Sequence, residues 1–200
     1  MTLCIHFYPF GVKLAFSLVV DNFQTFYVSN SFANLASLAS RNPTIFAQAA
    51  MSKLSDPVPY ISGTTGKVVN VHSLVISMEE GVVSGYFWDT ACNGCEDTAA
   101  CQSVQTEWFQ SPTEGIRSAT NSYCVNSCSS SATDTACDLK IFVTWVGTDV
   151  KSKYLESANY RISNFKRQNI EQVFSSMKGL QPTTTPPTTV MSAAAKAMLK

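Results

Sequence analysis

Six of the seven cysteines lie between residues 92 and 137, and their spacing is the strongest chemical signal in the chain. These six are Cys92, Cys95, Cys101, Cys124, Cys128 and Cys137. The seventh, Cys4, lies close to the N-terminus. Sulfur atoms at this density serve as disulfides, as metal ligands or as redox-active thiols. Each of these three states implies a different class of protein.

Disulfide pairing is the state that the composition favours. Charged residues make up 14% of the chain, against roughly a quarter in a typical soluble domain, while serine and threonine are abundant. Such a composition is typical of secreted proteins, in which disulfides form and persist. The spacing does not choose among the connectivities that six cysteines allow. We expect each sulfur to reach a separate partner rather than Cys92 to bond directly to Cys95.

Two alternative states of the cysteines remain open. In a zinc site, Cys92 and Cys95 would form one half and Cys124 and Cys128 the other, giving four thiolate ligands. In a thiol–disulfide oxidoreductase, Cys92 and Cys95 would be a catalytic C-x-x-C pair that follows an apolar strand with an aromatic pair, VVSGYFWDTACNGC. The segment after Cys95 is a poor helix former, which argues against this second alternative.

Catalytic and cofactor-binding motifs are missing from the sequence, so we expect neither enzymatic activity nor a cofactor. The two histidines are His6 and His72. His72 falls within a predicted strand, where packing explains it better than acid–base chemistry. No nucleophile elbow, zinc-protease, phosphate-binding or dinucleotide-binding fingerprint is present.

Charge is balanced overall, with 14 basic and 14 acidic residues, but it is unevenly distributed. Residues 79–138 carry nine acidic side chains and one basic side chain, whereas residues 140–200 carry nine basic and three acidic ones. The basic side chains that can face an anionic partner, such as a sulfated glycan or lipid headgroups, are Lys151, Lys153, Arg161, Lys166 and Arg167. We expect no nucleic-acid partner, because the net charge is zero and no binding motif is present. The expected partner is an unknown protein or glycan.

Residues 1–56 are predicted to be an apolar and partly helical N-terminal segment. The first twenty residues fit a short signal sequence, a segment that associates with a membrane, or a buried strand or helix. Ser31 can cap a helix that ends before Pro43, and Pro43 can open a second helix that ends near Leu54. The Asp56-Pro57 step ends this segment.

Residues 57–180 are predicted to be a cysteine-rich β domain. Alternating and β-branched residues predict strands over 67–78, 82–89, 104–111, 139–146 and 153–162, and a loop over 111–122. The first two strands form a hairpin around Glu79-Glu80-Gly81. A helix from Asn169 to Gly179 closes the domain.

Together these patterns predict a mainly β (α+β) fold, namely a small antiparallel β domain stapled by disulfides, with a C-terminal helix and a short helical N-terminal segment. Residues 181–200 are predicted to be a linker and tail rich in threonine and proline. The matching function is a secreted or cell-surface binding or structural module. A thiol–disulfide oxidoreductase and an intracellular zinc-binding module are the alternatives.

Overall fold

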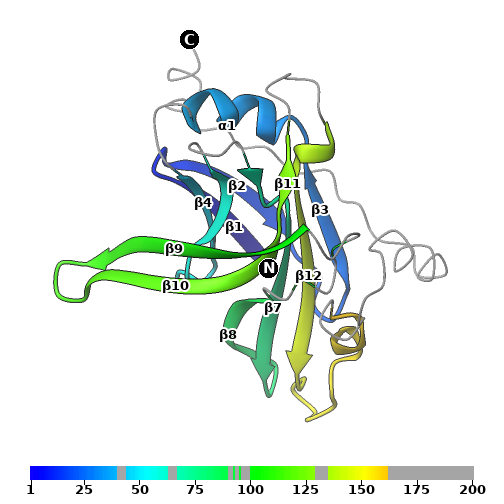
Figure 1. Cartoon of the computed structure of the whole chain (residues 1–200). Helices are drawn as coiled ribbons and strands as arrows, with labels where there is room; N and C mark the ends of the chain where they lie inside the picture. The colour runs from blue at the N-terminus through cyan, green and yellow to red at the C-terminus, as the bar shows by residue number, and fades with distance from the viewer. Residues whose placement is uncertain are drawn as a thin grey trace.

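The computed structural model describes residues 1–39, 44–62, 67–89, 92, 95, 100–128 and 135–161. This part of the chain folds mainly into β-strands (Figure 1). The strands are β1 (Thr2–Tyr8), β2 (Val12–Ser17), β3 (Gln24–Val28), β4 (Thr44–Ala50), β5 (Val58–Ser62), β6 (Lys67–Val68), β7 (Val71–Glu79), β8 (Val82–Asp89), β9 (Cys101–Ser111), β10 (Gly115–Cys124), β11 (Asn126–Ser127) and β12 (Leu139–Gly147). The helical elements are α1 (Ser31–Ala39) and two 3-10 turns, η3 (Thr135–Cys137) and η4 (Glu156–Tyr160).

The strands form three sheets. One has six strands in the order β11–β6–β5–β4–β1–β2, one has four in the order β3–β12–β7–β8, and β9 pairs with β10 alone. Neighbouring strands are antiparallel except β12 and β7, which are parallel. The prediction of a mainly antiparallel β fold is therefore confirmed. Because β4 pairs with β5, the boundary predicted between residues 56 and 57 falls within the six-stranded sheet.

The two larger sheets face each other across a hydrophobic core. Leu3, Ile5 and Phe7 alternate along β1 and are buried almost completely. The rings of Phe16 on β2 and Phe26 on β3 join the sheets, with their centroids 4.7 Å apart. Since successive side chains of a strand point to opposite faces, the remaining residues of β1 and β4 point away from the core. That outward face contributes to the candidate site described below.

The strand β12 is buried on both faces, although alternation in the sequence predicted burial on one. Its inner face joins the core, and η4 covers part of its outer face. Ser157 of η4 accepts the backbone N–H of Trp145 at 3.0 Å and donates to the Trp145 carbonyl at 3.2 Å. The Asp21 carboxylate accepts the backbone N–H groups of Glu156 and Ser157. The strand predicted over 153–162 is wrong, because these bonds hold residues 156–160 in a 3-10 turn.

The predicted helical N-terminal segment is wrong as a description of residues 1–56, which are mainly strands where the structure describes them. The helix predicted from Pro43 to Leu54 is instead the strand β4 over residues 44–50. Ile45, Ala47 and Ala49 alternate into the core there. The apolar residues of this short run match the helical period as well as the strand period, and pairing with β1 and β5 decides between them.

Two other N-terminal expectations agree with the structure. Residues 1–20 contain β1 and β2, so the structure agrees with the buried strand among the alternatives given for this segment. A helix begins at Ser31 as predicted, although its N-terminus is held by a distant residue. The buried Asp138 carboxylate accepts the backbone N–H of Asn30 at 2.8 Å and that of Phe32 at 3.1 Å. Asp138 also accepts the Tyr27 hydroxyl at 2.9 Å, so one side chain connects β3, α1 and the start of β12.

The predicted β7–β8 hairpin is confirmed, with Glu80 and Gly81 at positive φ in its turn. The loop predicted over 111–122 is wrong, because β10 begins at Gly115 and pairs with β9 along its length. Serine, threonine and asparagine suggested a loop, but cross-strand pairing overrides that preference. The predicted C-terminal helix and the tail over 181–200 lie outside the described residues. Within those residues, no helix is long and apolar enough to cross a membrane.

Candidate functional site

Three disulfides connect the six clustered cysteines: Cys92–Cys101, Cys95–Cys124 and Cys128–Cys137. Cys101 and Cys124 lie opposite each other in the register of β9 and β10. Each therefore takes a different partner from the preceding C-x-x-C turn, and together the two bonds clamp the base of the hairpin. The third bond joins the end of β11 to η3. The predicted disulfide state is confirmed. The structure also gives the connectivity, which the cysteine spacing could not determine.

The two alternative cysteine states do not fit this pairing. The sulfurs of Cys92, Cys95 and Cys124 lie within 4.8 Å of one another because two disulfides are adjacent. All three are disulfide sulfurs, whereas a zinc site and a C-x-x-C catalyst both need thiolates. Cys95 is paired with Cys124 rather than with Cys92. Cys4 is the free cysteine among the described residues.

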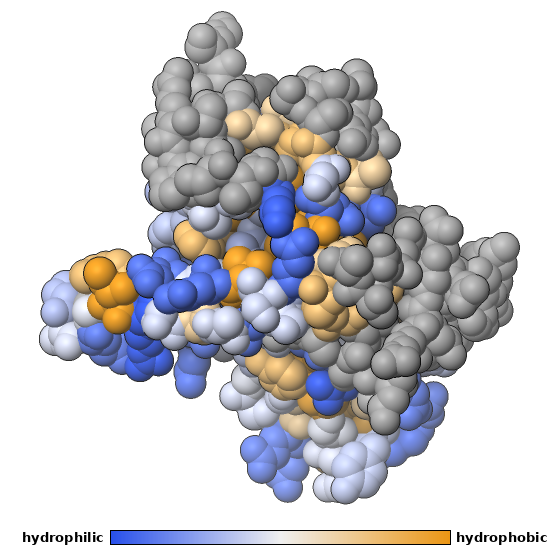
Figure 2. Space-filling model, viewed as in Figure 1, coloured by the Kyte–Doolittle hydropathy of each residue, from blue (hydrophilic) through white to orange (hydrophobic). Residues whose placement is uncertain are grey.

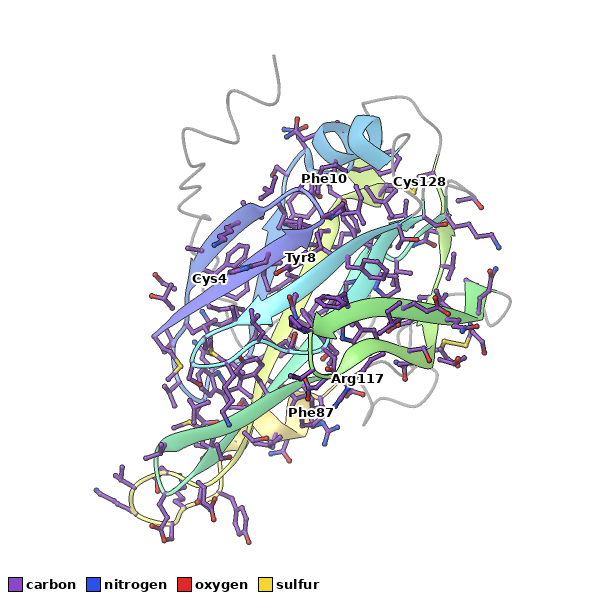
Figure 3. All side chains as sticks on the ribbon, turned by 90° about the vertical axis from the view of Figure 1, so that its left-hand side faces the viewer. Cys4, Tyr8, Phe10, Phe87, Arg117 and Cys128 are labelled. Carbon is purple, nitrogen blue, oxygen red and sulfur yellow. A yellow bond between two sulfur atoms is a disulfide. The ribbon has the colours of Figure 1, made fainter. Side chains whose placement is uncertain are left out.

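The β9–β10 hairpin, residues 101–124, projects from the two larger sheets as an arm (Figure 1). Tyr123 at its base and Thr106 halfway along it are buried, whereas Phe109 and Ile116 near its tip are 66% and 74% exposed. These two residues are register partners, and the tip shows as an apolar patch in Figure 2. Viewed from the tip, the arm runs between Tyr8 on one side and Phe87 on the other (Figure 3).

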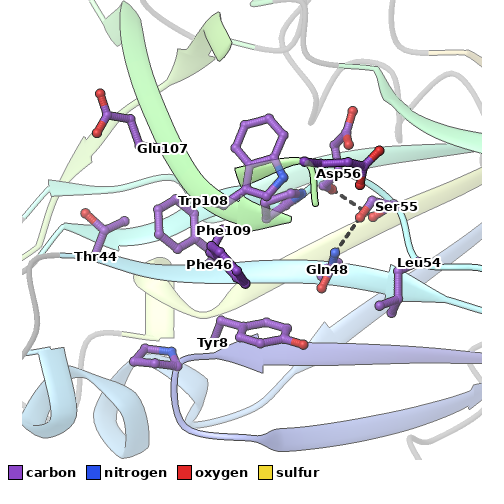
Figure 4. A pocket seen from close by; sticks show the side chains of 13 residues that line it. Tyr8, Thr44, Phe46, Gln48, Leu54, Ser55, Asp56, Glu107, Trp108 and Phe109 are labelled. Carbon is purple, nitrogen blue, oxygen red and sulfur yellow. Dashed lines mark hydrogen bonds between the residues drawn. The ribbon is translucent and has the colours of Figure 1, made fainter. Parts of the chain in front are cut away.

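An open groove of about 630 Å³ lies between the arm and the outward face of the six-stranded sheet (Figure 4). Its lining residues come from β1 and β4, from the segment between β4 and β5, and from the arm and its turn. They are Tyr8, Pro9, Thr44, Phe46, Gln48, Leu54, Ser55, Asp56, Pro57, Glu107, Trp108, Phe109 and Glu114. Aromatic rings and carboxyl groups thus dominate one continuous surface.

A smaller hollow of about 170 Å³ adjoins the groove and shares Asp56, Pro57 and Trp108 with it. It lies on the other side of the arm, where Phe87 and Tyr123 contribute to its lining. Trp108 therefore stands between the two spaces. The two spaces are adjacent, with the arm between them.

Internal hydrogen bonds hold the polar floor of the groove. The Gln48 amide donates to the Ser55 carbonyl at 2.6 Å. The Ser55 hydroxyl accepts the Ala49 backbone N–H at 2.9 Å and the Trp88 indole N–H at 3.0 Å. It also donates to the Asp56 carbonyl at 2.8 Å. These bonds fix the segment between β4 and β5 in place, and they engage an N–H of Gln48 and the hydroxyl of Ser55 before any ligand arrives.

His72 lies where the arm meets the two larger sheets. Its ring centroid is 5.5 Å from that of Trp88 on β8 and 6.2 Å from that of Tyr123 on β10. Complete burial lowers the pKa of His72 to about 4, because desolvation penalises the charged imidazolium. Burial likewise raises the pKa of Tyr123 to about 12. His72 is thus neutral at physiological pH and serves as a packed strand residue, as the sequence predicted.

The predicted basic residues are divided between two places. Lys151 and Lys153 lie together in the turn after β12, where Lys153 forms an ion pair with Glu156 at 3.1 Å. Arg161 packs against β8 instead, with a guanidinium nitrogen 3.6 Å from the Asp89 carboxylate. Its guanidinium carbon lies 5.6 Å from the centroid of the Phe87 ring. Lys166 and Arg167 lie outside the described residues.

The sequence did not reveal the groove. Its floor comes from β4, which was predicted to be a helix, and from β1, for which a buried strand was one of several alternatives. Its wall comes from an arm of which half was predicted to be a loop. Trp108 and Phe109 were assigned to a short strand, but no spacing linked them to Tyr8 or Phe46. Outward-facing aromatic residues in paired strands were the available signal.

Fold and site together define a disulfide-stabilised β-sandwich with an acidic, aromatic cleft along a hairpin arm. Residues 54–177 match the model of a protein family described as "Uncharacterised protein DDB_G0273449", and the chain belongs to that family. The matched range contains the arm and all six paired cysteines. No curated protein and no solved structure matches the chain.

Proposed function

We propose that this protein is a secreted or cell-surface binding module and that the groove beside the arm is its binding site. Three intramolecular disulfides support an oxidising, extracellular-type environment. The observation that carries the binding role is the groove itself. Its volume of about 630 Å³ falls within the range of about 300 to 1,000 Å³ that is common for ligand sites.

The exposure of the groove's aromatic side chains supports a binding role over a purely structural one. Tyr8 is 45% exposed and Phe109 is 66% exposed, and both line the groove. Aromatic side chains are enriched where proteins bind other molecules, because they bury large areas at low entropic cost. These rings do not pack in the hydrophobic core, so their placement on facing walls of the groove fits contact with a ligand.

The arm provides a wall that is fixed before a ligand binds. The two disulfides at its base connect both of its strands to the C-x-x-C turn. A wall held by covalent bonds loses little conformational entropy when a ligand binds. The site is therefore preorganised even though the arm makes few apolar contacts beyond its base.

Binding to arrays of immobilised peptides and oligosaccharides tests the proposed site. We expect the array spots that bind the natural protein to bind the Trp108→Ala variant weakly or not at all. Tyr154→Ala is the matched control, because Tyr154 is 80% exposed and lies outside the groove. Spots that retain both variants equally, or an array with no captured protein, would contradict the proposal.

The proposed location has its own test. Cell-surface biotinylation and analysis of the culture medium in the source organism should recover the protein with its three disulfides intact. Recovery in the reduced cytosolic fraction alone would contradict a secreted or cell-surface module.

A further inference from the structure

We propose that the groove binds a cationic peptide segment, with an arginine side chain held between the aromatic walls and the groove's carboxylates. This inference rests on the proposed function, because it names the ligand class of the same groove. Four observations support it: the sign of the charge, the occupied polar floor, the aromatic walls and an arginine that the protein already holds in this way.

The charged side chains that line the groove are all acidic, namely Asp56, Glu107 and Glu114. Glu114 lies 3.5 Å from Arg117. Asp56 and Glu107 form no ion pair with any residue that the structure describes. A cleft lined by one sign of charge concentrates ligands of the opposite sign, so the groove favours a cation over an anion.

The polar floor argues against a neutral glycan as the main ligand. Sugar hydroxyls need both hydrogen-bond donors and acceptors, but the Gln48 amide already donates to the Ser55 carbonyl, and the Ser55 hydroxyl already accepts from Ala49 and Trp88. The charged groups of the lining are all carboxylates, and an ionised carboxylate only accepts hydrogen bonds. A guanidinium group has five N–H donors and no acceptor, so it complements them.

The aromatic walls suit a planar cation. Phe46 lies on the floor and Trp108 and Phe109 on the arm (Figure 4). A cation over an aromatic face is attracted by the negative face of the ring, and arginine also stacks on the ring through its flat guanidinium group. Carboxylates beside these rings would add charge-assisted hydrogen bonds.

Arg161 is an internal example of this arrangement. Its guanidinium group lies over the Phe87 ring at 5.6 Å and beside the Asp89 carboxylate at 3.6 Å. An aromatic ring and a carboxylate therefore already hold an arginine on β8, and Phe87 also lines the smaller hollow beside the arm. The larger groove offers the same two kinds of group.

The placement of the acidic residues favours an extended segment over a free amino acid. Glu107 and Asp56 lie on either side of Trp108 in Figure 4, and the groove has a volume of about 630 Å³. A single side chain fills only part of such a space. A strand-like peptide that carries several basic residues can reach both carboxylates.

Fluorescence anisotropy with a labelled peptide of alternating arginine and glycine tests this inference. The same peptide with citrulline in place of arginine keeps the shape and removes the charge, and a neutral oligosaccharide tests the competing ligand class. We expect the arginine peptide to bind at least about ten-fold more tightly than the citrulline peptide.

Two double variants distinguish the effect of the groove's carboxylates from the effect of the protein's net charge. Asp56→Asn with Glu107→Gln should weaken binding of the arginine peptide about ten-fold, since each exposed pair contributes a modest amount. Glu79→Gln with Glu80→Gln makes the same change in net charge in the exposed β7–β8 turn and should change the affinity less than about two-fold. Trp108→Ala should weaken binding about five-fold through loss of the cation–π contact.

The remaining outcomes separate failure of the ligand class from failure of the site. Equal binding of the arginine and citrulline peptides, or no binding of either, would overturn the cationic ligand. If the neutral oligosaccharide binds instead and Trp108→Ala abolishes it, the groove is the site and only the ligand class is wrong. If the arginine peptide binds Trp108→Ala and the Asp56/Glu107 variant as tightly as the natural protein, the peptide binds elsewhere, so the groove is not its site and this inference is wrong.

Discussion

The two-sheet body and the β9–β10 arm are both built from β-strands, but different forces position them. In the body, strands such as β1 and β12 are held by apolar side chains that are almost completely buried. In the arm, most side chains beyond the base are partly or fully exposed, and two disulfides fix the base. Burial therefore determines the body's position and covalent bonds determine the arm's.

This difference explains where the cleft lies. A hydrophobic core closes the space between two surfaces, whereas a disulfide can hold a strand pair beside a sheet without packing against it. The space left between the arm and the outward face of β1 and β4 is the groove. Changes in the body should then lower stability, and changes at the arm's base should alter the groove first.

The largest expected effect is in the body. Phe7→Ala removes a ring that is 1% exposed and faces Tyr60 across 6.0 Å, and it should lower the free energy of unfolding by about 4 kcal/mol. Urea denaturation measures the change. Phe109→Ala is the matched control on the arm, where the same substitution should cost less than about 0.5 kcal/mol. Similar costs at both positions would remove the distinction between body and arm.

Removal of the longer hairpin disulfide should have the next largest effect. Cys95→Ser with Cys124→Ser opens a bond between residues 29 apart in sequence, which is worth about 3.6 kcal/mol in the chain-entropy model. Hydrogen exchange should accelerate in β9 and β10 and remain slow in β1 and β12. Uniform acceleration across the protein would show that the arm and the body unfold as one unit.

Acid should weaken the junction between arm and body. The pKa of His72 is about 4 in the folded state and 6.5 as its ordinary value, so the unfolded state binds the proton first as the pH falls. The resulting stability is complete above about pH 6.5 and is lost toward pH 4. From this group alone we expect a loss of about 2 kcal/mol between pH 7.5 and pH 5.

Urea denaturation of His72→Gln at both pH values checks this prediction. The variant should lose most of the pH dependence. His6→Gln is the control, because His6 lies on the outward face of β1 and is only partly buried. An unchanged pH dependence in His72→Gln would show that another group is responsible.

The smallest expected effect is at the tip of the arm. Ile116 is 74% exposed, so Ile116→Ser should change the free energy of unfolding by less than about 0.5 kcal/mol. A loss above about 1 kcal/mol in urea denaturation would mean that the tip packs against something in solution. Concentration dependence of that loss would identify a second copy of the chain as the packing partner.

The contrast between body and arm also explains how far the sequence could predict the fold. The β7–β8 hairpin was predictable because β-branched runs flank a turn with a glycine at positive φ, Gly81. The strand β4 was not, because Ile45, Phe46 and Ala49 fit the helical period as well as Ile45, Ala47 and Ala49 fit the strand period. The burial of β12 on both faces was missed because it depends on η4, which is held in place by Ser157 and Asp21. Asp21 is far from η4 in sequence, and no local pattern marks Ser157 as the partner of Trp145.

The candidate site was less predictable than the fold. The cysteines predicted disulfides but not their pairing, because pairing depends on the register that places Cys101 opposite Cys124. The groove depends on the same register and on which face of β1 and β4 points outward. Tyr8, Phe46 and Trp108 meet only after three separate segments are placed, and no local pattern contains that information.

Disulfide mapping of the natural protein is the most direct test of an arm fixed by covalent bonds. The protein should be alkylated before denaturation, digested without reduction and analysed by mass spectrometry, with metal content measured on the same sample. We expect linked peptides for Cys92–Cys101, Cys95–Cys124 and Cys128–Cys137, alkylation at Cys4 only, and no bound zinc. A peptide with Cys92 bonded to Cys95, or alkylated cysteines in this cluster together with zinc, would contradict it.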